Sequence, residues 1–467
     1  MNPFNGEEQN MVIEGQTVRL PTLDGGYETL SPSITFRKPC WMPDEKAASC
    51  LNCGVKFSQL KRKHHCRNCG KIFCSKCCFE KMCLPHFGLK DPEKVCNNCK
   101  LIVELMMKSK SDNMAMKYEA VEGLSTLTKN VAGLCKVIEC GGLHIMLSMA
   151  LNGDAKLKGA VASALHNITQ NMMLNTFLTE IGCLKVLKCI ISSSNSTEVL
   201  SDCLSALNLL CMDFNIRTKV LKEGMISPLL TIISSTGTIA VFAARILLLL
   251  VNNFDHHEFI LQNHSSIISD LFDCLQDEDY QMQTCISKML VFFSAGSISL
   301  RQAIIQEDVN RSFPLTYLLK GAYQNVLVNV ICIVANLSLD INENYVHQYV
   351  TGLCELLNSL NEESEEMYIH LGRGLANFAE NPANTLHMIH HLPSIITNLL
   401  KSAFEVPKIH ASRVIIYLFS TEPTCTLDVL SQSGMDEFIE IIFNLPGITD
   451  ILNNLLLRKV SRLSVCQ

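Results

Sequence analysis

The sequence lacks a hydrophobic segment long enough to cross a bilayer. Its most apolar stretch, residues 239–251, is thirteen residues long and includes Arg245, whereas a membrane-spanning helix needs about 20 apolar residues. The N-terminus, MNPFNGEEQN, also lacks the basic and apolar segments of a secretory signal. We therefore expect a cytoplasmic protein that meets any membrane only at its surface.

Charged residues are also scarce, at 18% of the chain against 48% hydrophobic residues, which excludes a largely disordered protein. One region has little negative charge. Residues 41–100 contain ten Lys and two Arg against five acidic residues, a net charge of +7, while residues 101–467 carry −11. A basic module joined to an acidic body predicts an anionic partner for the module alone.

Cysteine, by contrast, is abundant, and eight of the 23 cysteines form four Cys-x-x-Cys pairs between residues 50 and 99. Two such pairs can complete a tetrahedral zinc site of four thiolates. Because only four residues separate Cys69 from Cys74, neighbouring pairs are expected to bind different ions, so we predict a cross-brace with two Zn²⁺. The predicted ligands are Cys50, Cys53, Cys74 and Cys77 for the first ion, and Cys66, Cys69, Cys96 and Cys99 for the second.

Both sites are closed shells of four thiolates, so the zinc ions are expected to be structural. The alternative, a disulfide framework, is typical of secreted chains. Cys78, Cys83 and His86 lie outside the ligand spacing and are expected to be packing or surface residues. The cysteines after residue 100 occur singly, which is typical of small buried residues in a reducing compartment.

A basic run, Arg62-Lys63-His64-His65-Cys66-Arg67, leads into the second pair. On a zinc-stabilised strand, these side chains would offer charge-assisted donors to a phosphomonoester, which carries about −1.5 to −2 charges. The neighbouring Leu60 could enter the headgroup boundary of a membrane while lysines meet the anionic leaflet. A solvated basic face is the simpler alternative.

Three motifs resemble the signatures of FYVE zinc fingers. They are Trp41-Met42-Pro43-Asp44, the run from Arg62 through Gly70, and Lys94-Val95-Cys96. The resemblance covers about sixty residues and implies binding of phosphatidylinositol 3-phosphate on early endosome membranes. It also implies a headgroup pocket made of Arg62, Lys63, His64, His65 and Arg67.

The resemblance implies finer roles as well. Arg67 would contact the 3-phosphate with Lys94 as its partner, Asp44 would accept hydrogen bonds from ring hydroxyls, and Trp41 would pack beneath the pocket. Leu60 would insert into the membrane. Two positions depart from the family: Lys94 stands where Arg is usual and cannot form a planar fork, and Gln59 takes one of two commonly apolar positions in the insertion loop.

Residues 110–467 contain a repeat with a period near 42. A short apolar motif ends at Asn130, Asn171, Asp213, Asn253, Gly296, Asp340, Asn381 and Glu422, in steps of 40 to 44 residues. Glycines recur in phase at 141, 182 and 224, and again at 352 and 434, and a ninth, cap-like copy lies around residues 452–462. Each unit is predicted to contain a short helix, a Gly and two longer helices. Such units must stack to bury their apolar faces.

This pattern resembles armadillo repeats, with some units similar to the related HEAT type. We therefore predict a mainly α fold. Residues 1–40 would be a flexible leader, and residues 41–101 a two-zinc cross-brace finger with short β-hairpins and a C-terminal helix. Residues 110–467 would be an α-solenoid of about eight armadillo-like repeats, right-handed as the resemblance implies.

The solenoid sequence has no catalytic pattern, so we do not expect an enzyme. The pairs His256-His257 and His390-His391 are expected at exposed helix ends or loops. Asn167, Asn336 and Asn377 occupy equivalent places, where armadillo proteins can hold an extended peptide, although bonding within the fold is the simpler expectation.

The leading hypothesis is an adaptor: the finger binds membranes and the solenoid binds a protein partner. The alternatives are a ubiquitin-ligase-like component, whose cross-brace normally includes a His ligand, and a zinc finger protein that binds no lipid. Nucleic-acid binding is not expected, because the body is acidic and few aromatic side chains accompany the basic run.

Overall fold

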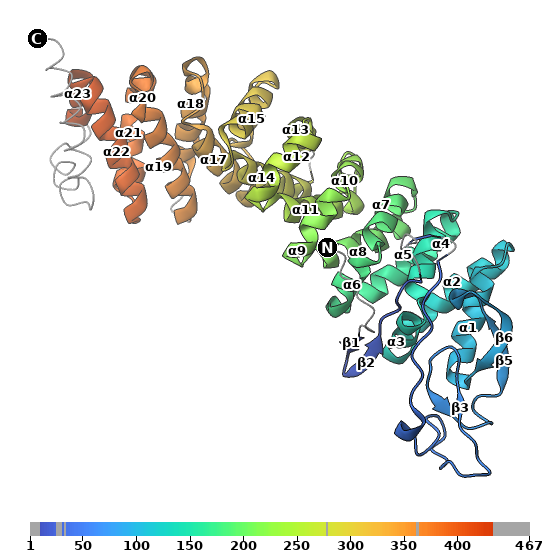
Figure 1. Ribbon diagram of the computed structural model, residues 1–467. Helices are drawn as coiled ribbons and strands as arrows, with labels where there is room; N and C mark the ends of the chain where they lie inside the picture. Colours follow the sequence, from blue (N-terminus) through green and yellow to red (C-terminus); the bar gives the residue numbers. More distant parts are fainter. Residues whose placement is uncertain (1–9, 25–29, 32–33, 277–278, 361–363, 433–467) are drawn as a thin grey trace, which may run out of the picture. The chain divides into compact units, whose positions relative to one another are not determined.

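The computed structural model describes residues 10–24, 30–31, 34–276, 279–360 and 364–432. A small strand-containing finger is followed by stacked helices (Figure 1), so the predicted mainly α class is confirmed. The chain forms two compact units, Met1–Pro228 and Leu229–Gln467. The predicted copy at residues 452–462 and the glycine at 434 lie outside the described residues, and the right-handed sense of the solenoid stays a prediction.

The helices repeat in sets of three, as predicted, but the predicted short first helix is wrong for α15, which is longer than the α16 that follows it. The first helices are α3 Val131–Glu139, α6 Asn175–Glu180, α9 Phe214–Lys222, α12 His257–Asn263, α15 Ile298–Asn310 and α20 Thr385–Ile389. The second helices are α4 Gly142–Leu151, α7 Cys183–Ser193, α10 Ile226–Ile233, α13 Ile267–Leu275, α16 Pro314–Leu318 and α21 Leu392–Ile395, which continues as the π-helical η6 Ile396–Leu400. The third helices are α2 Met114–Thr128, α5 Ala155–Thr169, α8 Thr197–Cys211, α11 Thr238–Val251, α14 Tyr280–Ser294, α17 Gln324–Leu337, α19 Glu365–Glu380 and α22 Glu405–Thr421. The remaining helices are α1 Asn97–Ser109, α18 Glu343–Ser359, α23 Pro423–Gln432, and the 3-10 turns η1 Asp44–Lys46, η2 Pro85–Phe87, η3 Met172–Leu174, η4 Phe254–His256 and η5 Pro382–Asn384.

Third helices pack side by side within each unit: α2, α5 and α8 in the first, and α11, α14, α17, α19 and α22 in the second. In the described part of the chain, no single helix has both the length and the apolar composition to cross a membrane. Two sharply bent pairs, α3 with α4 and α11 with η4–α12, meet these criteria only when both members are taken together.

In five of the repeats, the recurring polar residue is a helix N-cap. The side-chain oxygen of Asn130 accepts the backbone N–H of Gly133 at 2.8 Å. Four equivalent residues accept the N–H two positions further along: Asn171, Asp213, Asn253 and Asn381. An N-cap satisfies donors that a helix start otherwise leaves unpaired, which explains why this position is visible in the sequence.

The recurring glycine reverses the chain between the first and second helices. Gly141, Gly182 and Gly224 have φ angles of +75°, +94° and +76°, a left-handed conformation that other residues adopt only with strain. Gly352 is different, because it lies inside the continuous helix α18. The predicted break at this glycine is wrong, and the first two helices of that repeat are fused.

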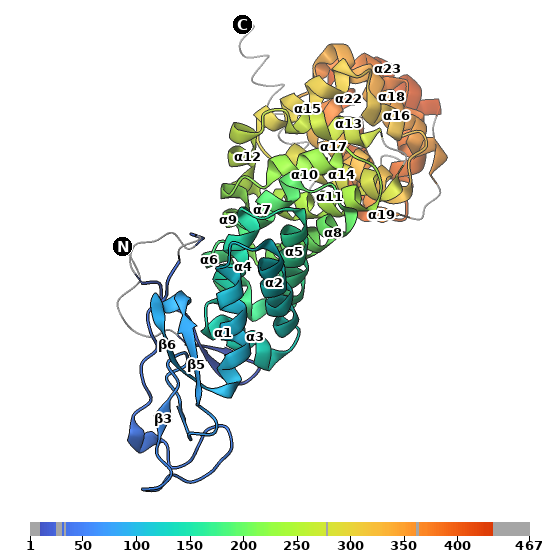
Figure 2. The ribbon, with the colours of Figure 1, turned by 90° about the vertical axis from the view of Figure 1, so that its right-hand side faces the viewer.

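The finger contains two antiparallel hairpins and ends in α1. β3 His64–His65 pairs with β4 Ile72–Phe73, and β5 Glu80–Leu84 pairs with β6 Leu89–Val95. Helix α1 lies beside β5 and packs against α2 and α4 (Figure 2). Helices α1 and α2 approach closely at Gly123, where an added Cβ would lie 2.5 Å from the side chain of Leu105. Helix α1 therefore connects the finger to the solenoid and packs against both.

The expectation of a flexible leader over residues 1–40 does not hold for its described part. β1 Asn10–Ile13 and β2 Gln16–Arg19 form a hairpin beside α3, with Ile13 and Val18 fully buried. Phe36 is also buried, and its ring fills the space beside Gly141, where an added Cβ would lie 2.4 Å away. The apolar residues of this segment therefore complete the core between the finger and the first repeat.

Candidate functional site

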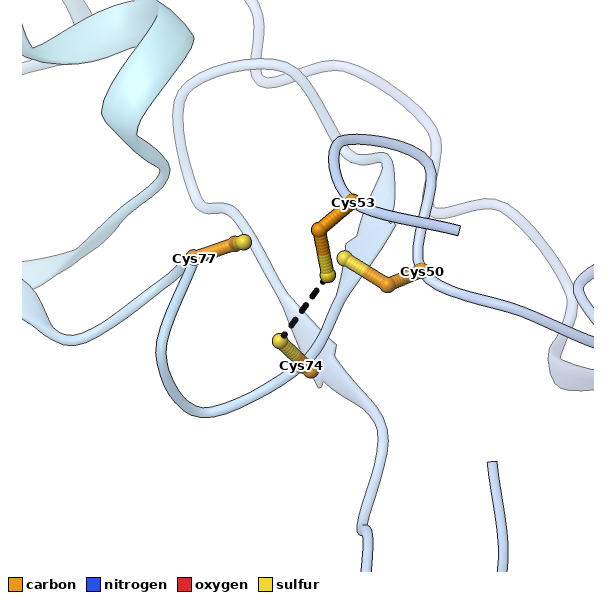
Figure 3. Close-up of side chains that lie close together, drawn as sticks. All are labelled: Cys50, Cys53, Cys74 and Cys77. Carbon is orange, nitrogen blue, oxygen red and sulfur yellow. Dashed lines mark hydrogen bonds between the residues drawn. The ribbon is translucent and has the colours of Figure 1, made fainter. Parts of the chain in front are cut away.

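The first predicted cysteine group comes together as expected. The sulfurs of Cys50, Cys53, Cys74 and Cys77 all lie within 4.8 Å of one another (Figure 3). Those of Cys53 and Cys74 are 3.7 Å apart, close to the edge of about 3.8 Å expected for a tetrahedron with Zn–S bonds of about 2.3 Å. Burial opposes ionisation of Cys50, but backbone N–H groups, first that of Cys53, lower the pKa of its thiol to about 6.

The second group, Cys66, Cys69, Cys96 and Cys99, has the same spread and lies deeper in the fold. The backbone N–H of Cys96 donates to the sulfur of Cys66 at 3.3 Å, and Cys99 lies in the first turn of α1. The cross-brace is confirmed: the pairs alternate, and each group can hold one zinc ion with no other ligand required.

Lys136 of the first repeat places a positive charge beside the second cysteine group. Its ammonium lies 3.1 Å from a carboxylate oxygen of Glu139, whose other oxygen is 3.8 Å from the finger residue Lys71. Burial disfavours the charge on Lys136, but the neighbouring sulfurs of Cys140 and Cys99 raise its pKa. A zinc ion with four thiolates carries a net charge of about −2, which a nearby cation stabilises.

A chain of buried polar contacts joins the finger to Cys140, which directly follows α3 in the first repeat. The imidazole of His86 is fully buried, and its Nε2 lies 2.7 Å from Oδ1 of Asn68. The amide nitrogen of Asn68 donates to the sulfur of Cys140 on the repeat at 3.1 Å. Burial lowers the pKa of His86 to about 4, so this ring is neutral and structural. Of the cysteines outside the ligand spacing, Cys78 is buried and Cys83 is half-buried.

The basic run meets the first sequence motif at His65. The ring of His65 stacks on Trp41, with centroids 4.7 Å apart. Its Nε2 lies 2.8 Å from the carbonyl of Met42 and 3.6 Å from a carboxylate oxygen of Asp44. Two motifs that are far apart in the sequence therefore form one surface.

Arg67 is held beside this histidine by several contacts. Its guanidinium lies over Trp41, 4.4 Å from the ring centroid, and its Nη1 donates to the carbonyl of His65 at 2.8 Å. Its Nε lies 3.5 Å from a carboxylate oxygen of Glu93. The backbone N–H of Arg67 donates to the carbonyl of Lys94 at 2.8 Å, so β6 fixes the place of this arginine.

His64 has different neighbours, because adjacent residues of a strand point to opposite faces. Its Nδ1 lies 3.3 Å from the ammonium of Lys94. Desolvation and the positive charges of Lys94, Arg62 and Arg67 lower the pKa of His64. The side chain of Lys94 therefore extends toward the first histidine, while only its backbone contacts Arg67.

Arg62 and Lys63 precede the strand. Arg62 is exposed, and the ammonium of Lys63 donates to the carbonyl of Asp44 at 2.6 Å. Lys63 is therefore held at the first motif, and Arg62 is open to solvent. The residues predicted to bind a headgroup thus fall into two sets: Lys63, His65 and Arg67 lie around Asp44 and Trp41, and His64 lies with Lys94. The carboxylate of Asp44 is able to accept hydrogen bonds from hydroxyls.

Leu60 stands at the tip of a tight turn. Ser58 and Lys61 exchange two backbone hydrogen bonds of 3.2 and 3.0 Å across it. The side chain of Leu60 is 96% exposed. An apolar side chain held in water on a short turn is suited to entering the boundary of a bilayer.

The histidine pair at 256–257 was expected on the surface, and that expectation is wrong. Both rings are buried: His256 binds the carbonyl of Leu250 at 3.0 Å, and His257 binds that of Val251 at 2.7 Å. The two rings hydrogen-bond to carbonyls at the C-terminal end of α11, which have no partner within the helix.

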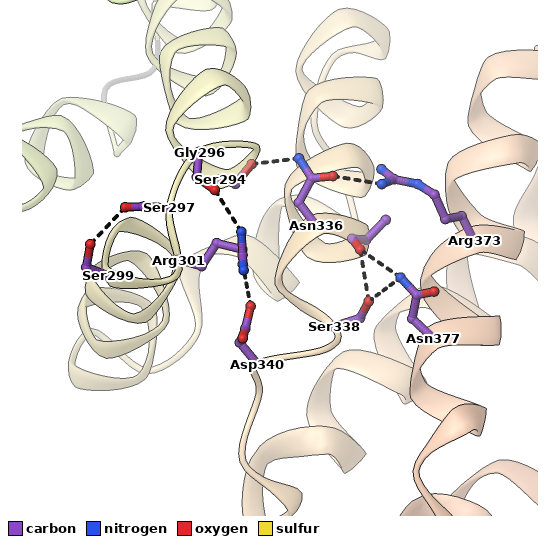
Figure 4. A network of polar contacts seen from close by, with 11 residues as sticks. Ser294, Gly296, Ser297, Ser299, Arg301, Asn336, Ser338, Asp340, Arg373 and Asn377 are labelled. Atoms are coloured by element: carbon purple, nitrogen blue, oxygen red, sulfur yellow. Dashed lines mark hydrogen bonds and ion pairs between the residues drawn. The ribbon is translucent and has the colours of Figure 1, made fainter. Parts of the chain in front are cut away.

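Two of the recurring asparagines bond between repeats (Figure 4). Asn336 donates to Ser294 at 2.9 Å and accepts from Arg373 at 2.8 Å. Asn377 donates to the carbonyl of Ala335 at 3.3 Å and to Ser338 at 3.1 Å. The amides are engaged by neighbouring third helices, which favours the structural expectation over a ladder for a bound peptide.

The sequence analysis missed Glu93 at Arg67 and Lys136 at the second cysteine group. Glu93 could have been noticed as the acid directly before Lys94. No local signal indicates that Lys136 would approach the finger, because that contact depends on how the first repeat packs.

Comparison with known proteins supports the two-part organisation. Residues 40–104 match the FYVE zinc finger family. Over 82 residues, the chain is 45% identical to the putative 1-phosphatidylinositol 3-phosphate 5-kinase of Drosophila melanogaster, covering 18% of this chain and 4% of that protein. Over 59 residues, it is 51% identical to the phosphatidylinositol-3,5-bisphosphate 3-phosphatase MTMR4 of Xenopus laevis, covering 13% and 6%. The chain thus spans a small fraction of the length of these curated relatives.

Solved structures resemble the helical part in fold. An engineered protein superposes with a TM-score of 0.55 at 17% identity, over 74% of this chain and 85% of that one. A computationally designed armadillo repeat protein for modular peptide recognition gives a TM-score of 0.42 at 17% identity, over 50% of this chain and 99% of its own. The packing of the third helices and the first of these superpositions agree on a helical-repeat solenoid after the finger at residues 40–104.

Proposed function

We propose that this chain is a non-enzymatic cytoplasmic adaptor. Its FYVE zinc finger at residues 40–104 binds phosphatidylinositol 3-phosphate at the surface of early endosome membranes, and its solenoid binds a protein partner. The names of the matched kinase and phosphatase both concern phosphoinositides that carry a 3-phosphate. Two zinc ions bound by the cysteine groups would hold the fold of the finger and take no part in chemistry.

One observation carries the lipid-binding proposal: Arg67, His65, Asp44 and Trp41 converge on one surface of a finger that also exposes Leu60. The cations would bind the phosphate, while Asp44 would accept the ring hydroxyls. Leu60 would enter the bilayer boundary, and the nearby lysines would add about 1 kcal/mol each at an anionic leaflet.

The test is sedimentation with phosphatidylcholine vesicles carrying each phosphoinositide in turn. We expect the wild-type chain to prefer the 3-phosphate lipid, and Arg67→Ala to weaken that binding by about 10- to 100-fold, since a charge-assisted hydrogen-bond donor is lost. Lys90→Ala, which removes one exposed cation elsewhere on β6, is the matched control and should bind like wild type. Equal wild-type binding to all the phosphoinositides would exclude the proposal.

Binding is also expected to strengthen as pH falls. Desolvation and nearby cations lower the pKa of His64 in the free finger, whereas a bound phosphate would raise it. Binding then takes up a proton, so affinity rises as pH falls through the interval between the bound and free pKa values and levels off below it. Each unit of difference between these values gives about a tenfold gain. Vesicle titrations from about pH 7.5 to about pH 5.5 should show this rise in wild type and a flatter profile in His64→Asn.

A further inference from the structure

The carboxylate of Glu93 contacts Arg67, the residue that the proposed function assigns to the phosphate. Glu93 lies on β6, directly before Lys94, and its Oε2 is 3.5 Å from Nε of Arg67. The side chains of Glu93 and Arg67 are 38% and 31% exposed. The ion pair therefore sits at the surface, where an incoming anion can reach it.

The contacts of Arg67 show which of its N–H groups already donates a hydrogen bond within the finger. Nη1 already donates to the carbonyl of His65, and the face of the guanidinium covers Trp41. Oxyanions bind arginine best through two parallel N–H groups. The edge formed by Nε and Nη2 is such a fork, and Glu93 lies at its Nε end.

We propose that Glu93 is an internal counter-anion that occupies Arg67 in the lipid-free finger and that the headgroup phosphate must displace. This inference rests on the proposed function of the finger. A phosphomonoester carries about −1.5 to −2 charges and has three acceptor oxygens, so it competes successfully with a single carboxylate. The displaced carboxylate stays close to the phosphate, and their repulsion lowers the affinity.

The same contact acts on other anions. An anionic lipid that carries only a phosphodiester or one carboxylate must also displace Glu93 before it binds Arg67, at the same cost in free energy. The remaining repulsion is smaller for such a lipid than for the more highly charged phosphomonoester, so Glu93 lowers its affinity by a smaller factor.

The test compares Glu93→Gln with wild type in the full chain. The probes are phosphatidylcholine vesicles with phosphatidylinositol 3-phosphate, soluble inositol 1,3-bisphosphate, and phosphatidylcholine vesicles with phosphatidylserine. We expect Glu93→Gln to strengthen binding of the first two by about three- to tenfold, as fits the loss of a surface ion pair together with a repulsion. Binding to phosphatidylserine vesicles should rise by a smaller factor.

Two control variants separate a local effect at Arg67 from net charge. Asp91→Asn removes the same charge from an exposed position on the same strand and should change binding by less than about twofold. In an Arg67→Ala background, Glu93→Gln should add less affinity than in the wild-type background, because only the repulsion between the carboxylate and the phosphate is then relieved.

The outcomes are distinct. If wild type shows no preference for the 3-phosphate, the proposed function fails, and this inference fails with it. If wild type shows that preference but Glu93→Gln binds equally or more weakly, only the counter-anion is excluded. A gain on vesicles without a gain for the soluble headgroup would also exclude it, because this pattern indicates a general surface-charge effect.

Discussion

Replacement of Cys69 by serine is expected to unfold the finger and to reduce binding of phosphatidylinositol 3-phosphate vesicles by more than about 100-fold. Structural zinc sites contribute about 10–16 kcal/mol, which equals or exceeds the whole stability of a typical domain, about 5–15 kcal/mol. The second group includes Cys96 and Cys99, at the start of α1. Loss of this ion would therefore also release the helix that begins the solenoid.

Metal analysis and vesicle sedimentation measure the two parts of this prediction. Wild type should contain two zinc ions per chain, one for each cysteine group, and Cys69→Ser should contain at most one. Cys83→Ser is the matched control, because Cys83 lies outside both groups and its thiol donates only to the carbonyl of Lys90. A Cys69→Ser chain that kept both ions and bound vesicles normally would contradict the cross-brace.

Replacement of Phe36 by alanine is expected to lower the free energy of unfolding of the first unit by about 3–5 kcal/mol. The ring is 1% exposed, fills the space beside Gly141 and lies edge-on to His144, with centroids 5.2 Å apart. The backbone N–H of Phe36 donates to the carbonyl of His86 in the finger at 2.8 Å. The cavity left by alanine would therefore lie at the junction of the finger and the first repeat.

Denaturant titration of the full chain, with hydrogen exchange of the amides in α3 and α4, gives the measurement. Phe79→Ala provides the control, since Phe79 is also on the finger but is 59% exposed, and it should change stability by less than about 0.5 kcal/mol. If the two variants were equally stable, the N-terminal segment would contribute little to the core.

The zinc ligands and the repeat could be predicted because their signals are local. A Cys-x-x-Cys pair binds a metal through its own short turn, and the gap of four residues between Cys69 and Cys74 is enough to indicate the cross-brace. The repeat was visible because several copies share an N-cap, as at Asn130, and a glycine at a left-handed turn, as at Gly141. Gly352 shows the limit of this argument, because a helix can also continue through a glycine.

Several expectations failed where packing decides the outcome. Residues 10–24 have few local signals for order, yet Ile13 and Val18 are buried beside α3. The pair at 256–257 is polar in sequence but buried, because its rings bind carbonyls at the end of α11. Burial of this kind depends on neighbouring elements, which composition does not reveal.

The sequence by itself determined the metal frame, the basic run and the repeat, because each depends on residues close together in the chain. Only the tertiary structure decided that Arg67 meets Glu93, since the two residues lie on different segments of the finger. It also decided that α1 joins the finger to the solenoid, because that depends on the packing of α1 against α2. The finger is thus built into the first repeat, and Arg67 of its basic run already contacts a carboxylate, that of Glu93.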